Sequence, residues 1–300
     1  MVLKKIAPLF VALGALSFGV PASLFKIARR EGVVNGPLLF WSFLSAVVIL
    51  GIVHVARRNW LRYQHTNWKQ IGLVIAAGTG SGFTNTFYIQ ALKLIPVAAA
   101  AVMLMQAVWL SVLLGSLIQR RWPSRLQVLS IVLVLVGTVL AAGLFPITEA
   151  LSPLGLFFGF LAACGYACTM QFTASLGNNL DPMTKTWLLC FGAFLLISIV
   201  WGPQITTSPV TWPTLKWGVL IALFSMVFPL VAYSLFMPLL DLGIGPILSS
   251  LELPSSIAVA FILLGETVSG LQMVGVLIII TAVVLPNVWG MWHRQRTNKA

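Results

Sequence analysis

Long apolar segments alternate with short polar breaks along the whole chain of 300 residues. Each apolar segment contains about 18 to 22 residues, close to the ~20 helical residues that cross a ~30 Å hydrocarbon core. Because lipid offers the backbone no hydrogen-bond partners, such segments are expected to form a bundle of helices. The pattern predicts an all-α polytopic membrane protein with ten transmembrane helices. Their predicted ranges are 6–24, 37–55, 71–91, 97–117, 126–143, 154–175, 185–202, 217–238, 246–264 and 271–290.

The composition fits a chain embedded in lipid, and its charge is distributed with a direction. Hydrophobic residues make up 59% of the chain and charged residues only 8%, whereas about a quarter of a soluble domain is charged. If the N-terminus is inside, the outside segments contain only five of the 18 basic residues, namely Lys26, Arg29, Arg30, Lys93 and Lys216. The positive-inside rule then predicts cytoplasmic termini, with the 144–153 and 203–214 loops in the periplasm. The net charge of +12 thus reflects topology, and no nucleic-acid partner is expected.

Several motifs occur twice, at one constant offset of 145 residues. The matched pairs are Gly36-Pro37 with Asp181-Pro182, Tyr88 with Tyr233, and Ser124-Arg125-Leu126-Gln127 with Ser269-Gly270-Leu271-Gln272. They predict two repeats of five helices, residues 1–145 and 146–300. Since five is an odd number, the two repeats must cross the membrane in opposite directions. Inverted repeats are typical of secondary transporters, whose solute site lies near the midplane between the halves.

The second half contains three short motifs that resemble a known family. They are L-E-x-P at Leu251–Pro254, L-L-G-E at Leu263–Glu266 and L-Q-x-x-G at Leu271–Gly275. The stretch resembles the second repeat of EamA-type carriers of the drug/metabolite transporter superfamily. The first repeat is similar but departs from the pattern at Arg120-Arg121, where Gly-Glu is usual. The resemblance covers the whole chain and implies a carrier in a bacterial inner membrane. By analogy it favours export of an amino acid or related metabolite.

Polar residues recur at helical spacing in three of the predicted spans. In the span 71–91 they form a face with Gly78 at one end, and buried polar groups in lipid need partners or water. We expect this face to line a solute path together with side chains from the spans 154–175 and 217–238. The predicted solute-binding residues are Ser81, Asn85, Tyr88, Tyr166, Thr169 and Tyr233. Packing between helices is the alternative. Three tyrosines without a Lys or Arg in mid-span would suit a small neutral or zwitterionic solute.

Glu252 is the only acidic residue placed well inside a predicted span. A carboxylate at this depth is costly and usually faces a cavity or a partner. Ser249 and Ser256 share its helical face. One interpretation is a carboxylate that contacts the solute or titrates, coupling transport to protons. The other is a packing residue that is hydrogen-bonded to a neighbouring helix, and the sequence leaves both open.

Prolines interrupt the helical hydrogen bonds of three spans, at Pro21, Pro229 and Pro254. Each removes one donor and kinks its helix, which makes these residues hinge candidates. Glu266 is expected to be a solvated or helix-capping group at an outer loop. Asp181 is expected to cap the helix that begins at the following proline.

The sequence contains no pattern of an enzyme, a cofactor site or a metal site. A Walker A motif, HExxH and a Ser-His-Asp set are all missing, and Cys164 and Cys168 lack further ligands nearby. Transport would therefore be driven by a proton gradient or by exchange. An uptake carrier for a vitamin or sugar and a non-transporting scaffold subunit are the alternatives. The expected partners are a small solute and the lipid bilayer, and a homodimer is left open.

Overall fold

The computed structural model describes residues 2–56, 68–143, 151–241 and 243–297, and these residues contain helices but no strand. The helices of the first half are α1 (Val2–Phe18), α2 (Val20–Arg30), α3 (Asn35–Ala56), α4 (Trp68–Leu92), α5 (Val97–Met105), α6 (Ala107–Gln119) and α7 (Arg125–Ala141). Those of the second half are α8 (Pro153–Ser175), α9 (Pro182–Thr207), α10 (Trp212–Ala222), η2 (Leu223–Val227), α11 (Phe228–Phe236), η3 (Met237–Leu239), α12 (Ile244–Ser249), α13 (Glu252–Leu264) and α14 (Gly270–Thr297).

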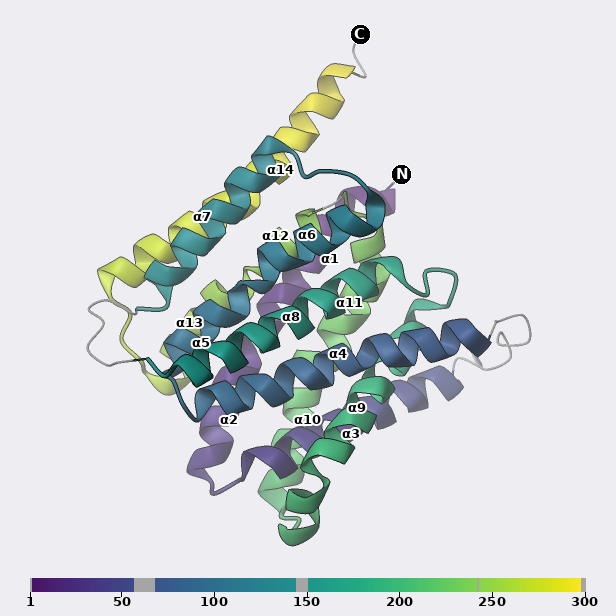
Figure 1. The fold of residues 1–300 in the computed structure, drawn as a ribbon, viewed down its shortest axis with the longest axis vertical. Helices are drawn as coiled ribbons and strands as arrows, with labels where there is room; N and C mark the ends of the chain where they lie inside the picture. The colour runs from purple at the N-terminus through teal and green to yellow at the C-terminus, as the bar shows by residue number, and fades with distance from the viewer. Residues whose placement is uncertain (1, 57–67, 144–150, 242, 298–300) are drawn as a thin grey trace.

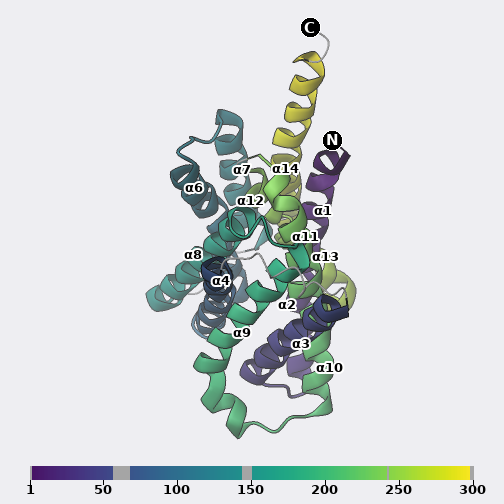
Figure 2. The same cartoon turned by 90° about the vertical axis from the view of Figure 1, so that its right-hand side faces the viewer.

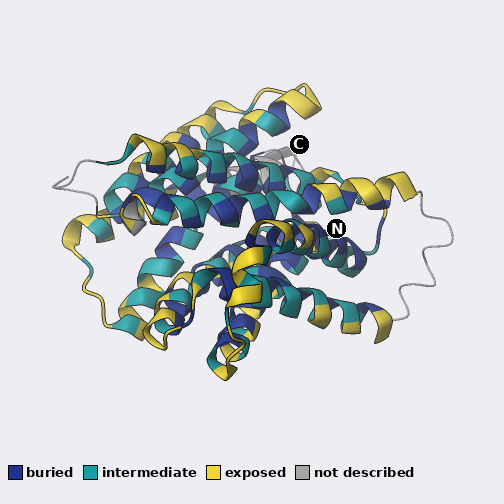
Figure 3. Ribbon diagram, turned by 60° about the horizontal axis from the view of Figure 1, so that its bottom comes forward, coloured by how far each residue is buried: buried dark blue, intermediate teal, exposed yellow. Residues whose placement is uncertain are grey.

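Seven helical segments of the described residues are long and apolar enough to cross a membrane. The helices Arg125–Ala141 and Gly270–Leu285 are apolar but shorter. The 25-residue helix α4 is not among the seven, because its polar face lowers its mean hydropathy. Buried residues lie between the helices, whereas exposed residues lie on the outer surface (Figure 3), where many large apolar side chains are found. The protein is thus an all-helical, multi-pass membrane protein, and the number of ten spans stays a prediction.

The helices pack so that the two halves interleave. α4 of the first half lies between α8 and α9 of the second half, and α7 lies along α14 (Figure 1). α1 begins and α14 ends at the same end of the bundle (Figures 1 and 2). We call this end the terminal end. α2, α4 and α13 reach the opposite end, which we call the mouth end (Figure 1).

Four predicted spans are interrupted rather than continuous: 97–117, which divides into α5 and α6 at Gln106, and the three that contain a hinge-candidate proline. The first of these three runs from Ile6 to Arg30 as α1 and α2, with a break at Gly19. The span 217–238 contains the π-helical turn η2, and the span 246–264 divides into α12 and α13. In each of these three spans the proline lies in the first turn of the helix that follows the break, where a missing N–H is tolerated. The prolines therefore mark the breaks, and a hinge at these places stays a prediction.

The break at Gly19 lies directly against α13. A Cβ atom at Gly19 would overlap the side chain of Ser255 and the backbone nitrogen of Ser256. In addition, the hydroxyl of Ser255 donates a 2.6 Å hydrogen bond to the carbonyl of Leu16. The kink between α1 and α2 therefore contacts the first turns of α13.

The repeated Ser-x-x-Gln motif has the same structure in both halves. The backbone N–H of Ser124 donates to Gln127 Oε1 at 2.8 Å, and Gln127 N–H donates back to Ser124 Oγ at 3.3 Å. Ser269 and Gln272 make the equivalent bonds at 2.9 and 3.2 Å. These reciprocal capping boxes satisfy N–H groups at the start of α7 and of α14. At Gly275 a Cβ would overlap the backbone of α7, so the two helices are in close contact.

Candidate functional site

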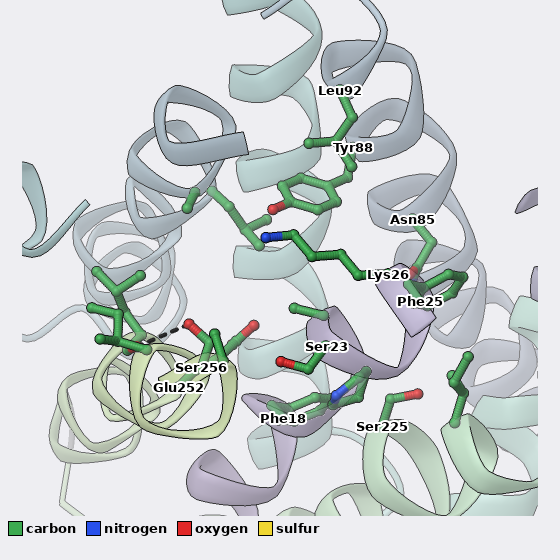
Figure 4. A pocket seen from close by; sticks show the side chains of 18 of the residues that line it. Phe18, Ser23, Phe25, Lys26, Asn85, Tyr88, Leu92, Ser225, Glu252 and Ser256 are labelled. Carbon is green, nitrogen blue, oxygen red and sulfur yellow. Dashed lines mark hydrogen bonds between the residues drawn. The ribbon is translucent and has the colours of Figure 1, made fainter. Parts of the chain in front are cut away.

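A cavity of about 510 Å³ lies between the two halves of the chain. Side chains from α2 and α4 of the first half and from α8, η2 and α13 of the second half line it (Figure 4). It reaches the mouth end at the exposed residues Lys26 and Glu266. Its inner end lies at Glu252, which begins α13, and at Tyr166, which bonds to Glu252. We call this inner end the floor. Between the floor and the terminal end lies a core cluster that includes Val11, Val108, Tyr233, Phe236 and Ile247.

The polar face of α4 divides into a packing part and a cavity part. Gly78 lies against the backbone of Leu189 in α9. One turn further on, Ser81, Asn85 and Tyr88 line the cavity. Asn85 Nδ2 donates a 2.9 Å hydrogen bond to the carbonyl of Ser81, which holds the amide along the helix. The 3.6-residue period of the helix brings these groups to one face, as the sequence predicts.

Tyr166 and Thr169 line the cavity from α8, but Tyr233 of α11 does not reach it. Tyr233 is 2% exposed, and its hydroxyl donates a 3.1 Å hydrogen bond to Ser249 Oγ. The ring of Phe18, which lines the cavity, lies 5.6 Å from the ring of Tyr233. The two symmetry-related tyrosines therefore differ: Tyr88 faces the cavity, and Tyr233 packs behind Phe18.

Glu252 is the first residue of α13 and faces the cavity. The hydroxyl of Tyr166 donates a 2.8 Å hydrogen bond to its Oε2 atom. Glu252 thus bonds to a neighbouring helix and also contacts the cavity, so features of both sequence interpretations are present. The start of α13 also favours negative charge here, because the helix dipole is positive at its N-terminus. Of the two serines expected on its face, Ser256 lines the cavity and Ser249 does not, since the break between α12 and α13 divides that face.

The mouth of the cavity holds an ion pair that the sequence analysis does not predict. Glu266 is an exposed residue of the loop before α14, as the sequence predicts, and Lys26 Nζ lies 2.6 Å from its Oε1 atom. Lys26 itself lies on α2 rather than in a loop and lines the cavity with Arg29. The helix continues past the predicted end of the first span because α2 is amphipathic, with its basic groups at the mouth. The solute path therefore contains basic groups after all, at its entrance.

Lys185, the first residue of the predicted span 185–202, is a buried basic residue. It belongs to α9 and is 1% exposed. Its Nζ donates to the carbonyl of Thr173 at 2.6 Å and to Asn178 Oδ1 at 2.7 Å. A cation at the last carbonyls of α8 is favourable because the helix dipole is negative there. Nearby, Asp181 caps α9 as predicted, accepting hydrogen bonds from the first-turn backbone N–H groups.

Among the further polar residues that line the cavity, Ser23 and Asn35 are not predicted from the sequence. Ser23 in the first turn of α2 is 1% exposed, and its hydroxyl points into the cavity on the side of Glu252 (Figure 4). Asn35 at the start of α3 lines the cavity with a buried Oδ1 that has no hydrogen-bond partner among the described residues. Both lie at a span end in the sequence, where polar residues are ordinary. Ser23 lies in the first turn of α2, directly after the break at Gly19, and lines the cavity from there.

Comparison with known proteins identifies the family. The EamA-like transporter family matches residues 5–143 and again residues 153–288. No curated protein matches the chain significantly. A solved structure described only as "Crystal structure of protein" is similar, with a TM-score of 0.78 and 17% sequence identity. The match covers 94% of this chain and 98% of that one, and at this identity it shows a shared fold alone. Because the family matches most of the sequence, the chain belongs to the EamA-like transporter family and is a membrane transporter of the drug/metabolite transporter superfamily.

Proposed function

We propose that the protein is a secondary transporter that moves a small neutral or zwitterionic metabolite by alternating access. The observation that carries this proposal is the cavity between the two halves. It reaches the mouth end of the bundle, and a buried apolar cluster separates it from the terminal end. A carrier of inverted repeats is expected to have such a site, open to one side at a time.

The lining of the cavity supports a small solute without a large net charge. Its volume falls within the range of about 300–1,000 Å³ that small-molecule sites occupy. Leu104 and Leu230 supply apolar surface, whereas Asn85 and Tyr88 supply groups for hydrogen bonds. An amino acid or related metabolite has both an apolar body and polar ends, and its export is the favoured activity.

The orientation follows from the basic residues. We place the terminal end in the cytoplasm of a bacterial cell, so that the cavity opens to the periplasm. Glu252 is the candidate for coupling to a proton gradient, and exchange of solutes is the alternative. We propose no catalytic step, cofactor, metal or nucleic-acid partner for this activity. We propose a homodimer as one form in which the carrier works.

Two alternatives make different demands on the same residues. An uptake carrier for a vitamin or sugar would use the same cavity in the other direction. A non-transporting scaffold subunit would tolerate apolar replacements in the polar face of α4, because only packing would matter there. The direction of solute movement distinguishes the uptake carrier from the exporter. The effect of an apolar replacement at Asn85 distinguishes the scaffold subunit from a carrier.

Untargeted metabolite profiling of medium and cytosol tests the proposal. Cells that overexpress the wild type are compared with cells that express equal amounts of Asn85→Leu. We expect one class of metabolite to accumulate in the medium with the wild type alone. Accumulation in the cytosol would instead favour uptake. Identical profiles for the two proteins at equal expression would overturn the carrier.

A further inference from the structure

The floor of the cavity contains a carboxylate that is only partly satisfied. Tyr166 donates to Glu252 Oε2, but Oε1 has no hydrogen-bond partner among the residues that the structure describes. An ionised carboxylate accepts several hydrogen bonds, and the half-buried side chain of Glu252 faces the cavity. The floor thus contains a carboxylate oxygen that can accept a further hydrogen bond, and no described side chain donates one to it.

The hydroxyl of Ser23 lies on the same side of the cavity as Glu252. Ser23 is 1% exposed, and Figure 4 shows its oxygen directed into the cavity beside Glu252. This hydroxyl makes no hydrogen bond within the described part of the chain, and it is not among the enclosed unsatisfied oxygens there, so the cavity reaches it. Buried hydroxyl groups are normally hydrogen-bonded. Two unsatisfied oxygens from α2 and α13 therefore face one space.

The two basic residues that line the cavity, Lys26 and Arg29, lie at its mouth and not at the floor. Lys26 is engaged with Glu266 at 2.6 Å, and Arg29 lies exposed on the next turn of α2, at the mouth. The ring of Phe18 also lines the cavity (Figure 4), and aromatic faces attract cations but not anions. The floor thus favours a positively charged group from the solute and disfavours a carboxylate or phosphate.

We infer that the floor is an ammonium site, in which Glu252 Oε1 and Ser23 Oγ bind the protonated primary amine of the solute. The inference rests on the proposed function, because it names the chemical class that the carrier accepts. An ammonium group has three donors: Glu252 and Ser23 accept two, and the third remains for water or the Phe18 ring. The body of the solute then extends toward Leu104 and Leu230, which are apolar lining residues.

Two probes with the same body isolate the amine. Leucine methyl ester carries a protonated amine near neutral pH, and N-acetyl-leucine methyl ester lacks that charge. Their binding to the full-length protein in lipid nanodiscs is measured by calorimetry. We expect the wild type to bind the amine at least about tenfold more tightly, as charge-assisted hydrogen bonds predict. Equal binding of the two probes by the wild type would overturn the ammonium site.

Variants assign the effect to the floor. Glu252→Gln should remove most of the preference for the amine, and Ser23→Ala should weaken amine binding by about tenfold. Glu31→Gln is the matched acid control, because Glu31 contacts Trp217 and Lys216 outside the cavity. Ser42→Ala is the matched serine control, since Ser42 bonds to the carbonyl of Leu39. Retention of the full preference by Glu252→Gln would contradict the inference.

Binding and transport can fail separately. Amine binding that depends on Glu252, without movement of any solute, would keep the ammonium site and reject the carrier. Solute movement by a wild type that binds both probes equally would keep the carrier and reject the ammonium site. The comparison of the two probes on the wild type does not depend on the folding of any variant.

Discussion

Lys26 Nζ lies 2.6 Å from Glu266 Oε1 at the mouth of the cavity. The pair joins α2, near the start of the chain, to the connection between α13 and α14. Both side chains are more than 40% exposed, so solvent and salt screen the attraction. We expect Lys26→Ala and Glu266→Ala each to lower the free energy of unfolding by only about 0.2–1 kcal/mol. A double-mutant cycle at low and high salt measures the coupling energy between the two residues. A coupling energy that is the same at both salt concentrations would contradict a screened ion pair.

Asn85 tests whether the polar face of α4 contacts the solute. Asn85→Leu removes an amide from the cavity but keeps a similar volume, so transport should fall to background while thermal stability changes little. The readout is solute flux in proteoliposomes together with the melting temperature of the purified protein. Asn179→Leu is the matched control, because Asn179 is exposed outside the cavity and bonds to Gln70. Normal flux through Asn85→Leu would mean that the face serves packing.

Glu252→Gln tests coupling to protons. The amide still accepts the hydrogen bond from Tyr166 but cannot titrate. At solute concentrations high enough to offset weaker binding, the variant should therefore still exchange solute across the membrane. It should lose the stimulation that an imposed pH gradient gives the wild type, because no carboxylate carries the proton from one side to the other. Flux is measured in proteoliposomes with and without the gradient. Equal stimulation of both proteins would assign coupling to another group.

Single cysteines test the orientation of the bundle. Cysteines at Glu149 and Thr206 should react with impermeant thiol reagents on intact cells, because both loops are predicted to be periplasmic. Glu149 lies outside the described residues, and Thr206 is in the last turn of α9. A cysteine at Asn179, on the predicted inner side, should react only after permeabilisation. The reverse pattern would place the terminal end outside.

Glycines set the close crossing of α4 and α9. A Cβ at Gly78 would overlap the backbone of Leu189, and one at Gly192 would overlap the backbone of Ile75. Gly78→Ala should therefore separate the helices and destabilise the protein by about 1–3 kcal/mol, the usual cost of overpacking. At Gly202 an added Cβ would meet nothing within 4 Å, so Gly202→Ala is a matched control of little effect. Unfolding in detergent measures both.

The sequence predicted well those features that depend on local periodicity. Apolar length located the helices, and the repeated Ser-x-x-Gln motif marked the equivalent starts of α7 and α14. Helical spacing also brought Ser81, Asn85 and Tyr88 to one face. Each of these follows from the chemistry of a single helix, which neighbouring helices do not change.

The sequence failed where a contact joins distant segments. Glu266 is an exposed loop residue, as predicted, but its ion pair with Lys26 was not predicted because the two residues are remote in sequence. Tyr233 looked equivalent to Tyr88, but Phe18 covers it and Ser249 binds its hydroxyl. Ser23 lines the cavity just after the break at Gly19, which the pattern of a continuous span does not predict. Such features depend on the arrangement of several helices, and no single-span pattern encodes them.

The contact between Gly19 and the first turns of α13 has a mechanical consequence. At Gly19 the kink between α1 and α2 touches α13 without an intervening side chain. A rotation of one segment toward the other would therefore press on its backbone. We therefore expect the angle between α1 and α2 to change together with the angle of α13. A methyl group at position 19 would overlap Ser255 and Ser256 and force α13 away from the kink. In Gly19→Ala the angle between α1 and α2 would then depend less on the angle of α13.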